Sequence, residues 1–384
     1  MPEFFEFQLG PRVVYQTHLV DELGSEVARL GGARALMITD HSVVHAGMAQ
    51  RVQTGLAKVV EVVGVFSDVP THSSVATVEQ GAALARETGA DLLITVGGGS
   101  PLNTAKAIRM LLAGGGQLRD YHTADLPNRS PVPLVAIPTT AGTGSEVAPF
   151  ATIRDEVQHR NLTFASPFLA PDLAVLDPTM TRTLPKHVTA ATGMDALTHA
   201  IEAFVSTRAN VISDSLALQA IDMISNNLRA AVHTGDDMEA RGQMLLASCM
   251  AGMAFSSALL GIVHAMSHTI GGQFDVHHGT ANAILLPHGM RFNSVVVPNR
   301  YSRIARALGV NAGGRAEEHV IEDGIAAVTA LAADCGLPTR LRDVGVPEDA
   351  VPAIADGTLT DSAIITNPRV ATVDEVGQIL RAAW

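Results

Sequence analysis

Residues 1–185 alternate between short apolar runs and helical segments, and this alternation constrains the fold more than any other feature of the sequence. The run "DLLITV" (91–96) is almost continuously apolar, which is typical of a strand covered on both faces. The preceding segment "SVATVEQGAALARETG" (74–89) has the period of an amphipathic helix and ends at a glycine. Strands separated by helices predict a Rossmann-like, doubly wound parallel sheet.

From residue 186 onward the pattern is almost purely helical. The segment 212–232 is one example, and the closing segment carries a capping box, Thr372 followed by Glu375. We therefore predict an α/β domain over residues 1–185 and an all-helical domain over residues 186–384, with a site expected between them.

Composition excludes several classes of partner. The net charge of −12 argues against binding to nucleic acid or to an anionic membrane surface. The two cysteines indicate no disulfide framework, and no signal peptide is evident, so a cytoplasmic location is expected. Residues 244–263 carry no charge over a membrane-span length, but serines and glycines dilute the run. A buried helix of a soluble enzyme is the favoured interpretation.

A glycine-rich turn follows the strand at 91–96, in "TVGGGSPLNTAKAI" (95–108). Glycines allow backbone amides to approach an anion closely, and the helix that follows has a partial positive charge at its N-terminus. The segment is therefore a candidate pyrophosphate site, although its spacing differs from G-x-G-x-x-G and an ordinary tight turn is the alternative. The candidate residues are Gly97, Gly98, Gly99 and Ser100.

A second polar loop, "IPTTAGTGSEV" (137–147), follows the next predicted strand. Its hydroxyls suit a further contact with a nucleotide, and an ordinary polar loop is the alternative. The candidate residues are Thr139, Thr140, Thr143 and Ser145.

Asp40 ends the predicted strand at 33–40. A carboxylate there can accept hydrogen bonds from the adenosine ribose, and it would repel a 2′-phosphate. We therefore predict NAD rather than NADP. The alternative is that Asp40 only caps the helix that starts near Ser42.

Two pairs of residues with one-turn spacing indicate a metal site. Asp195 and His199 are four residues apart in an apolar helical segment, and Glu202 lies on the same stripe. His264 and His268 form a second pair. Two helices can thus aim two ligands each at one point, and imidazoles with one carboxylate suit Fe²⁺, Zn²⁺, Mn²⁺ or Ni²⁺ rather than Ca²⁺.

Long motifs in order along the chain resemble the iron-containing (group III) alcohol dehydrogenase family. They are "GGGSPLNTAKAI", "IPTTAGTGSEV", "GMDALTHAIEAF", "GIVHAMSHTIGG", "HHGTANAILLPHG" and "NPR". The resemblance implies the dehydroquinate synthase-like fold of that family, a dinucleotide-binding α/β domain followed by a helical domain.

The resemblance also assigns roles to residues. Because the family's last ligand directly precedes a glycine, His278 is chosen over His277, and the implied metal ligands are Asp195, His199, His264 and His278. His268 resembles a second histidine near the substrate and is the candidate catalytic acid or base. Glu202 could support the metal ligands from behind, but the favoured interpretation is that its carboxylate lies on the helix surface.

Two positions depart from the family pattern. Asn103 stands where the family usually has Asp, and Asn161 stands where it often has a cofactor-binding Lys. The effect of these two residues on cofactor binding is left open.

The resemblance implies a metal-dependent alcohol dehydrogenase or aldehyde reductase that uses NAD, with Fe²⁺ as the favoured metal. The expected substrate is a small alcohol or aldehyde, and Phe150 and Phe255 are candidate pocket residues. Family habit and the apolar segment 4–16 favour a homodimer. The alternatives are a hydroxyacid–oxoacid transhydrogenase, a maleylacetate reductase, a dehydroquinate-synthase-like lyase and a metal- or nucleotide-binding module without turnover. The ligand Asp195 argues against the maleylacetate reductase, and the lyase is disfavoured because its site is richer in Lys and Arg than the candidate site of this chain.

Overall fold

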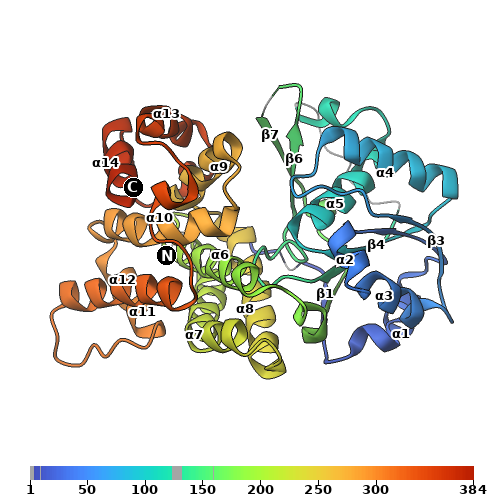
Figure 1. Cartoon of the computed structure of the whole chain (residues 1–384), viewed down its shortest axis with the longest axis horizontal. Helices are drawn as coiled ribbons and strands as arrows, with labels where there is room; N and C mark the ends of the chain where they lie inside the picture. Colours follow the sequence, from blue (N-terminus) through green and yellow to red (C-terminus); the bar gives the residue numbers. More distant parts are fainter. Residues whose placement is uncertain (1–3, 9, 123–131, 159) are drawn as a thin grey trace. The chain divides into compact units, whose positions relative to one another are not determined.

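The computed structural model describes residues 4–8, 10–122, 132–158 and 160–384. They form two compact units, Gln8–Leu184 and Pro185–Trp384, and residues 4–7 group with the second unit. The first unit is α/β and the regular elements of the second are helices, so the predicted fold class is confirmed (Figure 1).

The described part of the first unit contains a six-stranded parallel sheet with the order β1-β8-β5-β4-β2-β3. Its strands are β1 (Arg12–Tyr15), β2 (Arg34–Ile38), β3 (Glu61–Phe66), β4 (Leu92–Gly97), β5 (Leu134–Pro138) and β8 (Leu173–Leu176). Two further strands, β6 (Phe150–Asp155) and β7 (Arg160–Ala165), form an antiparallel hairpin between β5 and β8 in the chain. β2 and β4 are neighbours although β3 lies between them in sequence, so the strand order reverses beside β2.

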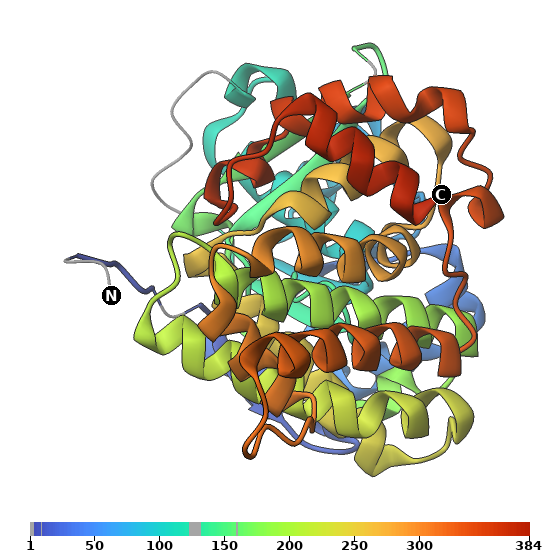
Figure 2. The same cartoon turned by 90° about the vertical axis from the view of Figure 1, so that its left-hand side faces the viewer.

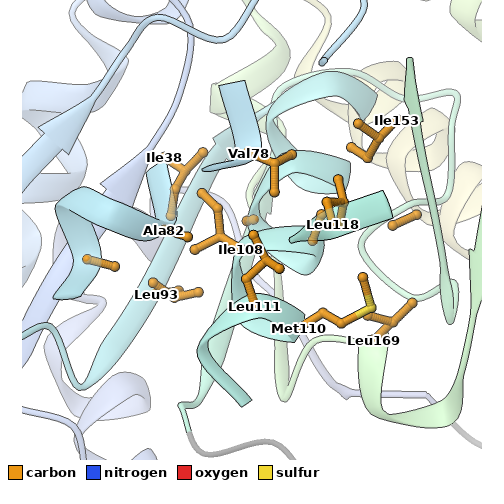
Figure 3. Close-up of a cluster of buried hydrophobic side chains, with 14 of the residues drawn as sticks. Ile38, Val78, Ala82, Leu93, Ile108, Met110, Leu111, Leu118, Ile153 and Leu169 are labelled. Atoms are coloured by element: carbon orange, nitrogen blue, oxygen red, sulfur yellow. The ribbon is translucent and has the colours of Figure 1, made fainter. Parts of the chain in front are cut away.

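Apolar side chains leave both faces of the sheet, which explains the continuous apolar runs in the sequence. On one face Ile38 and Leu93 join a core with residues of the helices α4 (Val75–Thr88) and α5 (Gly99–Gly114) (Figure 3). On the other face Met37 and Ile94 join a second core with residues of α1 (Gly24–Val27) and α3 (Met48–Leu56). The short helix α2 (His41–His45) follows β2. The sheet is therefore covered on both sides, as a doubly wound fold requires.

The helical unit is seen in Figure 2, where most of its helices run across the picture. Its helices are α6 (Lys186–Val205), α7 (Val211–His233), α8 (Met238–Ala258), α9 (Ile262–Phe274), α10 (His278–Ser294), α11 (Pro298–Ala307), α12 (Glu317–Asp334), α13 (Val351–Thr360) and α14 (Val373–Ala383). α6 is buried along almost its whole length. The capping box of Thr372 and Glu375 at the start of α14 is present, as predicted from the sequence.

The uncharged run 244–263 is not one helix, contrary to the expectation from the sequence. α8 ends at Ala258, Leu259 has a left-handed φ of 62°, and α9 begins at Ile262. The two helices are bent by 103° at this break. No single helix in the described ranges is long and apolar enough to cross a membrane, and only this bent pair passes a test of length and composition.

Candidate active site

The residues predicted to bind a nucleotide follow three neighbouring strands. Asp40 comes shortly after β2, Gly97–Gly99 end β4 and begin α5, and Thr139 follows β5. β2, β4 and β5 are adjacent and parallel, so their carboxyl ends lie at the same edge of the sheet. Ligands of doubly wound sheets bind outside this edge where the strand order reverses, here between β2 and β4.

The glycine-rich turn and the hydroxyl-bearing loop pack against each other. A Cβ added to Gly98 would lie 3.3 Å from the Thr140 side chain, and one added to Gly99 would lie 3.1 Å from Thr143. The Thr139 amide also donates to the Gly97 carbonyl at 3.0 Å. Gly97 has a φ of 155° and its Cβ would meet the Pro101 ring at 2.6 Å, so only glycine suits this position. The two predicted segments thus lie side by side at the N-terminus of α5.

The hydroxyls of these segments differ in what they contact. Ser100 Oγ donates to the Thr71 carbonyl, and Ser145 Oγ donates to Asn103 Oδ1 at 3.0 Å. Thr140 Oγ1 is buried and, within the described part of the chain, has no hydrogen-bond partner. A buried hydroxyl without a partner is unfavourable unless a ligand supplies one. Thr140 therefore suits a bound cofactor, whereas Ser100 and Ser145 already have structural partners.

Asp40 does cap a helix, which was the alternative interpretation. It is the N-cap of α2, and its Oδ1 accepts from the Val43 amide at 3.0 Å and from Ser42 Oγ at 2.5 Å. Among the described residues both of these bonds reach Oδ1, so Oδ2 is the oxygen that a ribose hydroxyl could approach. Capping and ribose binding are thus compatible.

Lys106 was missed by the sequence reasoning, although it is one of two charged residues, with Arg109, in the otherwise apolar part of α5. Its Nζ donates to Ser145 Oγ at 3.1 Å and to the carbonyls of Ala148 and Phe150 at 2.8 Å each. Burial lowers the pKa of Lys106 to about 7, and the nearby Glu146 carboxyl opposes this shift. Lys106 therefore ties α5 to the loop between β5 and β6.

The helical unit contains a buried group of three metal-ligand side chains, Asp195, His199 and His264. Asp195 and His199 come from α6 and His264 comes from α9, whereas His268, the second member of the pair on α9, is not in this group. One ligand atom of each lies within 4.8 Å of the others, and Asp195 Oδ1 is 4.0 Å from His199 Nε2 and 3.8 Å from His264 Nε2. Ligands bonded to one ion at about 2.1 Å lie roughly 3.4 Å apart, so small shifts would allow these atoms to bind one metal.

His278, at the start of α10, lies beside this group but outside it. Its Nε2 is 3.6 Å from Asp195 Oδ1, and its side chain is 36% exposed. The amide nitrogen of Asn282, one turn further along α10, lies 2.7 Å from Asp195 Oδ1, 3.3 Å from His264 Nε2 and 3.2 Å from His278 Nε2. The carboxylate oxygen of Asp195 and the two imidazole nitrogens thus lie close around one amide nitrogen. The donor set fits a divalent metal, and the role of His278 stays a prediction.

Electrostatics favour the protonation states that metal binding needs. Burial is the largest cause that lowers the pKa of His264 well below the usual imidazole value. Burial by itself would raise the pKa of Asp195, but the neighbouring imidazoles outweigh it and lower that pKa. Neutral imidazoles and an ionised carboxylate are the forms that bind a metal.

Glu202 is not a surface carboxylate, so the favoured expectation was wrong. It is 3% exposed, and its Oε2 lies 2.6 Å from His264 Nδ1. Burial raises the pKa of Glu202 to about 7, and backbone amides of α9 that donate to the carboxylate act in the opposite direction. The partners of Glu202 come from the start of α9, about 60 residues further along the chain. The helical spacing of α6 alone therefore could not show that Glu202 is buried.

His268 is one turn beyond His264 and contacts a carboxylate that the sequence did not indicate. Its Nδ1 lies 3.1 Å from Asp361 Oδ2, and its ring stacks on His278 with centroids 5.3 Å apart. Burial lowers the pKa of His268, but the hydrogen bond and charge of Asp361 and further carboxylates raise it overall. Asp361 is 93 residues away in the chain, and no motif points to it.

Of the other predicted residues, Phe255 stacks on His199 with centroids 4.6 Å apart. Asn161 is an exposed residue of β7 that pairs with Arg154. Asn103 accepts from Ser145, so the departure from Asp at this position keeps a link between α5 and the hydroxyl-bearing loop.

The glycine-rich turn of the α/β unit and the buried Asp–His–His group of the helical unit are the features of a metal-dependent dehydrogenase that uses a dinucleotide. Residues 10–178 match the family described as iron-containing alcohol dehydrogenase, and residues 189–384 match the C-terminal part of the Fe-containing alcohol dehydrogenase family. The chain belongs to the iron-containing alcohol dehydrogenase family, as the resemblance in the sequence implied.

Individual relatives are similar over nearly the whole chain. An NAD-dependent methanol dehydrogenase from Bacillus methanolicus is 35% identical over 377 residues, which cover 98% of this chain and 99% of the relative. A lactaldehyde reductase from Escherichia coli is 37% identical over 367 residues, 95% of this chain and 96% of the relative. A solved structure of a 1,3-propanediol oxidoreductase superposes with a TM-score of 0.96 at 37% identity, covering 100% of both chains.

Proposed function

We propose that this chain is an NAD-dependent alcohol dehydrogenase and aldehyde reductase that requires a divalent metal. The observation that carries the proposal is the buried group of Asp195, His199 and His264 in a chain of this family. The relatives are named for methanol, lactaldehyde and 1,3-propanediol, so a short primary alcohol, a diol or the corresponding aldehyde is the expected substrate.

Four side chains of the helical unit would hold the metal: Asp195, His199, His264 and His278. Fe²⁺ is the metal we favour, with Zn²⁺, Mn²⁺ and Ni²⁺ as alternatives that the donor set also suits. When bound, the metal polarises the oxygen of the alcohol or aldehyde, and the nicotinamide accepts or gives the hydride.

His268 is the proposed acid or base for the hydroxyl proton. Asp361 lies at hydrogen-bond distance from Nδ1 and favours a proton on that atom. In the neutral ring Nε2 then has the lone pair that can accept the substrate proton. Asp361 also favours the protonated ring that forms in this step, which is the role of a carboxylate behind a catalytic histidine.

The turn at Gly97–Gly99 and Ser100 would bind the pyrophosphate of NAD through backbone amides at the N-terminus of α5. Thr139, Thr140, Thr143 and Ser145 would line the neighbouring loop, where the unpartnered Thr140 hydroxyl supports a contact with the cofactor. Asp40 would bind the adenosine ribose through Oδ2.

The metal requirement can be tested by removing the ion. Exhaustive chelation should abolish alcohol-dependent reduction of NAD, followed by absorbance over a panel of short alcohols, and Fe²⁺ or Zn²⁺ should restore it. Full activity with a confirmed absence of bound metal would contradict the proposal and favour a maleylacetate-reductase type of reaction. Binding of metal and NAD without turnover of any substrate would instead favour a non-catalytic module.

We also propose that the enzyme is a homodimer in a reducing, cytoplasmic environment. β1 is an edge strand of the sheet, which leaves backbone groups available for pairing with a second chain. Residue 9 of the segment 4–16 lies outside the described residues. Both cysteines, Cys249 and Cys335, are free and buried. A monomeric mass by light scattering at micromolar concentration would contradict the dimer.

A further inference from the structure

The N-terminus of α9 is capped from outside the helix. Gly261 is its N-cap and has no side chain that could accept from the first amides. Instead, the amides of Gly261 and Val263 donate to Glu202 at 3.1 and 2.7 Å, and the His264 amide lies 3.4 Å from it. The Ile262 amide donates to Asn367 Oδ1 at 3.1 Å. Two buried side chains from distant elements thus satisfy the amides that a helix start leaves without partners.

The space around Gly261 is closed by these two caps. A Cβ added to Gly261 would lie 2.8 Å from Asn367 Oδ1 and 3.0 Å from Glu202 Oε1. Asn367 is itself fixed, because it exchanges two hydrogen bonds with Asn293 at 2.8 and 2.9 Å. The carboxylate of Glu202 therefore has a defined position relative to the first turn of α9.

The same carboxylate contacts the imidazole of His264. Oε2 lies 2.6 Å from His264 Nδ1, while His264 Nε2 lies 3.8 Å from Asp195 Oδ1. Three backbone N–H groups donate to the two oxygens of Glu202 and favour its ionised form. An ionised carboxylate can only accept, so the hydrogen between Glu202 and His264 belongs to Nδ1. Nε2 then has an available lone pair and can bind a metal.

We propose that Glu202 is the positioning residue of the metal site, which fixes both the tautomer of His264 and the placement of the first turn of α9. The proposal rests on the metal site of the proposed function. A carboxylate behind a metal-binding histidine makes the imidazole a better ligand, and loss of such a partner typically weakens metal binding by about 10–100-fold.

Glu202→Gln tests the proposal with little change in volume. Its amide group would present N–H toward either the α9 amides or His264 Nδ1, and the second arrangement moves the imidazole proton to Nε2. The apoprotein should bind Co²⁺, titrated by visible absorbance, about 10–100-fold more weakly than the unmodified protein. Gly261→Ala displaces the caps without changing charge and should also weaken binding, so it serves as a second variant if Glu202→Gln does not fold.

Asp237→Asn is the matched control. Asp237 is also an acidic cap of a helix in the same unit, and it accepts from the Ala240 amide at 3.0 Å at the start of α8. The control should bind Co²⁺ like the unmodified protein. Equal affinity of Glu202→Gln and the unmodified protein would overturn the proposal, as would an equal loss in Asp237→Asn.

A second readout separates this inference from the proposed function. In apoprotein with ¹⁵N-labelled histidine, NMR should find His264 protonated on Nδ1, and Glu202→Gln should shift the proton toward Nε2. If the unmodified protein binds no divalent metal, the proposed function fails, and the tautomer then decides the inference alone. An Nε2-protonated His264 in the unmodified protein would overturn it.

Discussion

Gly279 of α10 packs against the backbone of α6 at Ala191, and its replacement by alanine tests the geometry of the metal site. A Cβ at this position would lie 2.3 Å from the Ala191 carbonyl oxygen and 2.7 Å from its carbon. Real Cβ atoms essentially never come closer than 3.0 Å, so the backbones of α10 and α6 must separate by at least 0.7 Å at this contact. The opposing atoms are backbone rather than the end of a flexible side chain, so local adjustment is expensive.

The size of the effect follows from this distance. Overpacking of this kind typically costs about 1–3 kcal/mol, of which the better helix propensity of alanine returns up to ~1 kcal/mol. We expect a net loss of about 1–2 kcal/mol, and each kcal/mol should lower the Tm by roughly 2–4 °C for a unit of this size. His278 precedes Gly279 directly, and a metal site tolerates ligand displacements of only about 0.2 Å. Metal affinity should therefore fall by about tenfold or more if His278 is a ligand.

The assay compares Gly279→Ala with Gly272→Ala by thermal unfolding and by metal titration of the apoprotein. An added Cβ at Gly272 in α9 meets no heavy atom within 4 Å, so this control should be at least as stable as the unmodified protein and bind metal equally well. Unchanged stability and affinity in Gly279→Ala would refute the argument from close approach. Lost stability with unchanged affinity would instead remove His278 from the ligand set.

Three further predictions concern catalysis, cofactor choice and pH. His264→Ala should lose metal and activity together, whereas His268→Ala should keep its metal while kcat falls by about 10²–10⁴; metal analysis that finds the reverse would exchange the two roles. Asp40→Gly should improve the use of NADP relative to NAD, because glycine is a tolerated N-cap and removes the charge that repels a 2′-phosphate; equal use of both cofactors by the unmodified enzyme would count against this. Two hydrogen bonds from Arg119, at 2.9 and 3.0 Å, are the main reason why the pKa of Asp155 is held well below its usual range. The unmodified protein should thus be more stable than Asp155→Asn at neutral pH, and the difference should shrink as the pH falls below the ordinary carboxyl value of about 3.9; a difference in urea unfolding that stays constant down to pH ~3 would contradict it.

Features that depend on local spacing were predictable from the sequence. The parallel sheet follows from the apolar runs, and the i, i+4 spacing of Asp195 and His199 places both side chains on one face of α6. The glycines at 97–99 and the hydroxyls at 139–145 could be assigned to neighbouring strand ends because the carboxyl ends of a parallel sheet share an edge. Each of these features depends on residues that are close together in the sequence or on the regular geometry of a parallel sheet.

Features that depend on distant segments were not predictable in the same way. Glu202 was expected on a helix surface because the sequence of α6 does not show that the start of α9 covers it. Asp361 lies 93 residues from His268, and only the folded chain brings them together. Asn282 is an intermediate case, since its one-turn spacing from His278 was visible but an asparagine in a helix has many ordinary uses.

Because the sheet is parallel, changes to the residues at its two edges should have different consequences. Since every strand of the sheet runs in the same direction, the proposed nucleotide contacts lie at one edge and the turns that lead into the strands lie at the other. At that second edge Asp91 accepts from the amides of Ala33 and Arg34 at 2.9 and 2.7 Å and joins the starts of β2 and β4. A label, tag or charge introduced beside Gly31 or Gly89 would therefore affect the stability of the α/β unit and not the proposed nucleotide contacts at the opposite edge. These turns are thus suitable points for attaching the enzyme to a support.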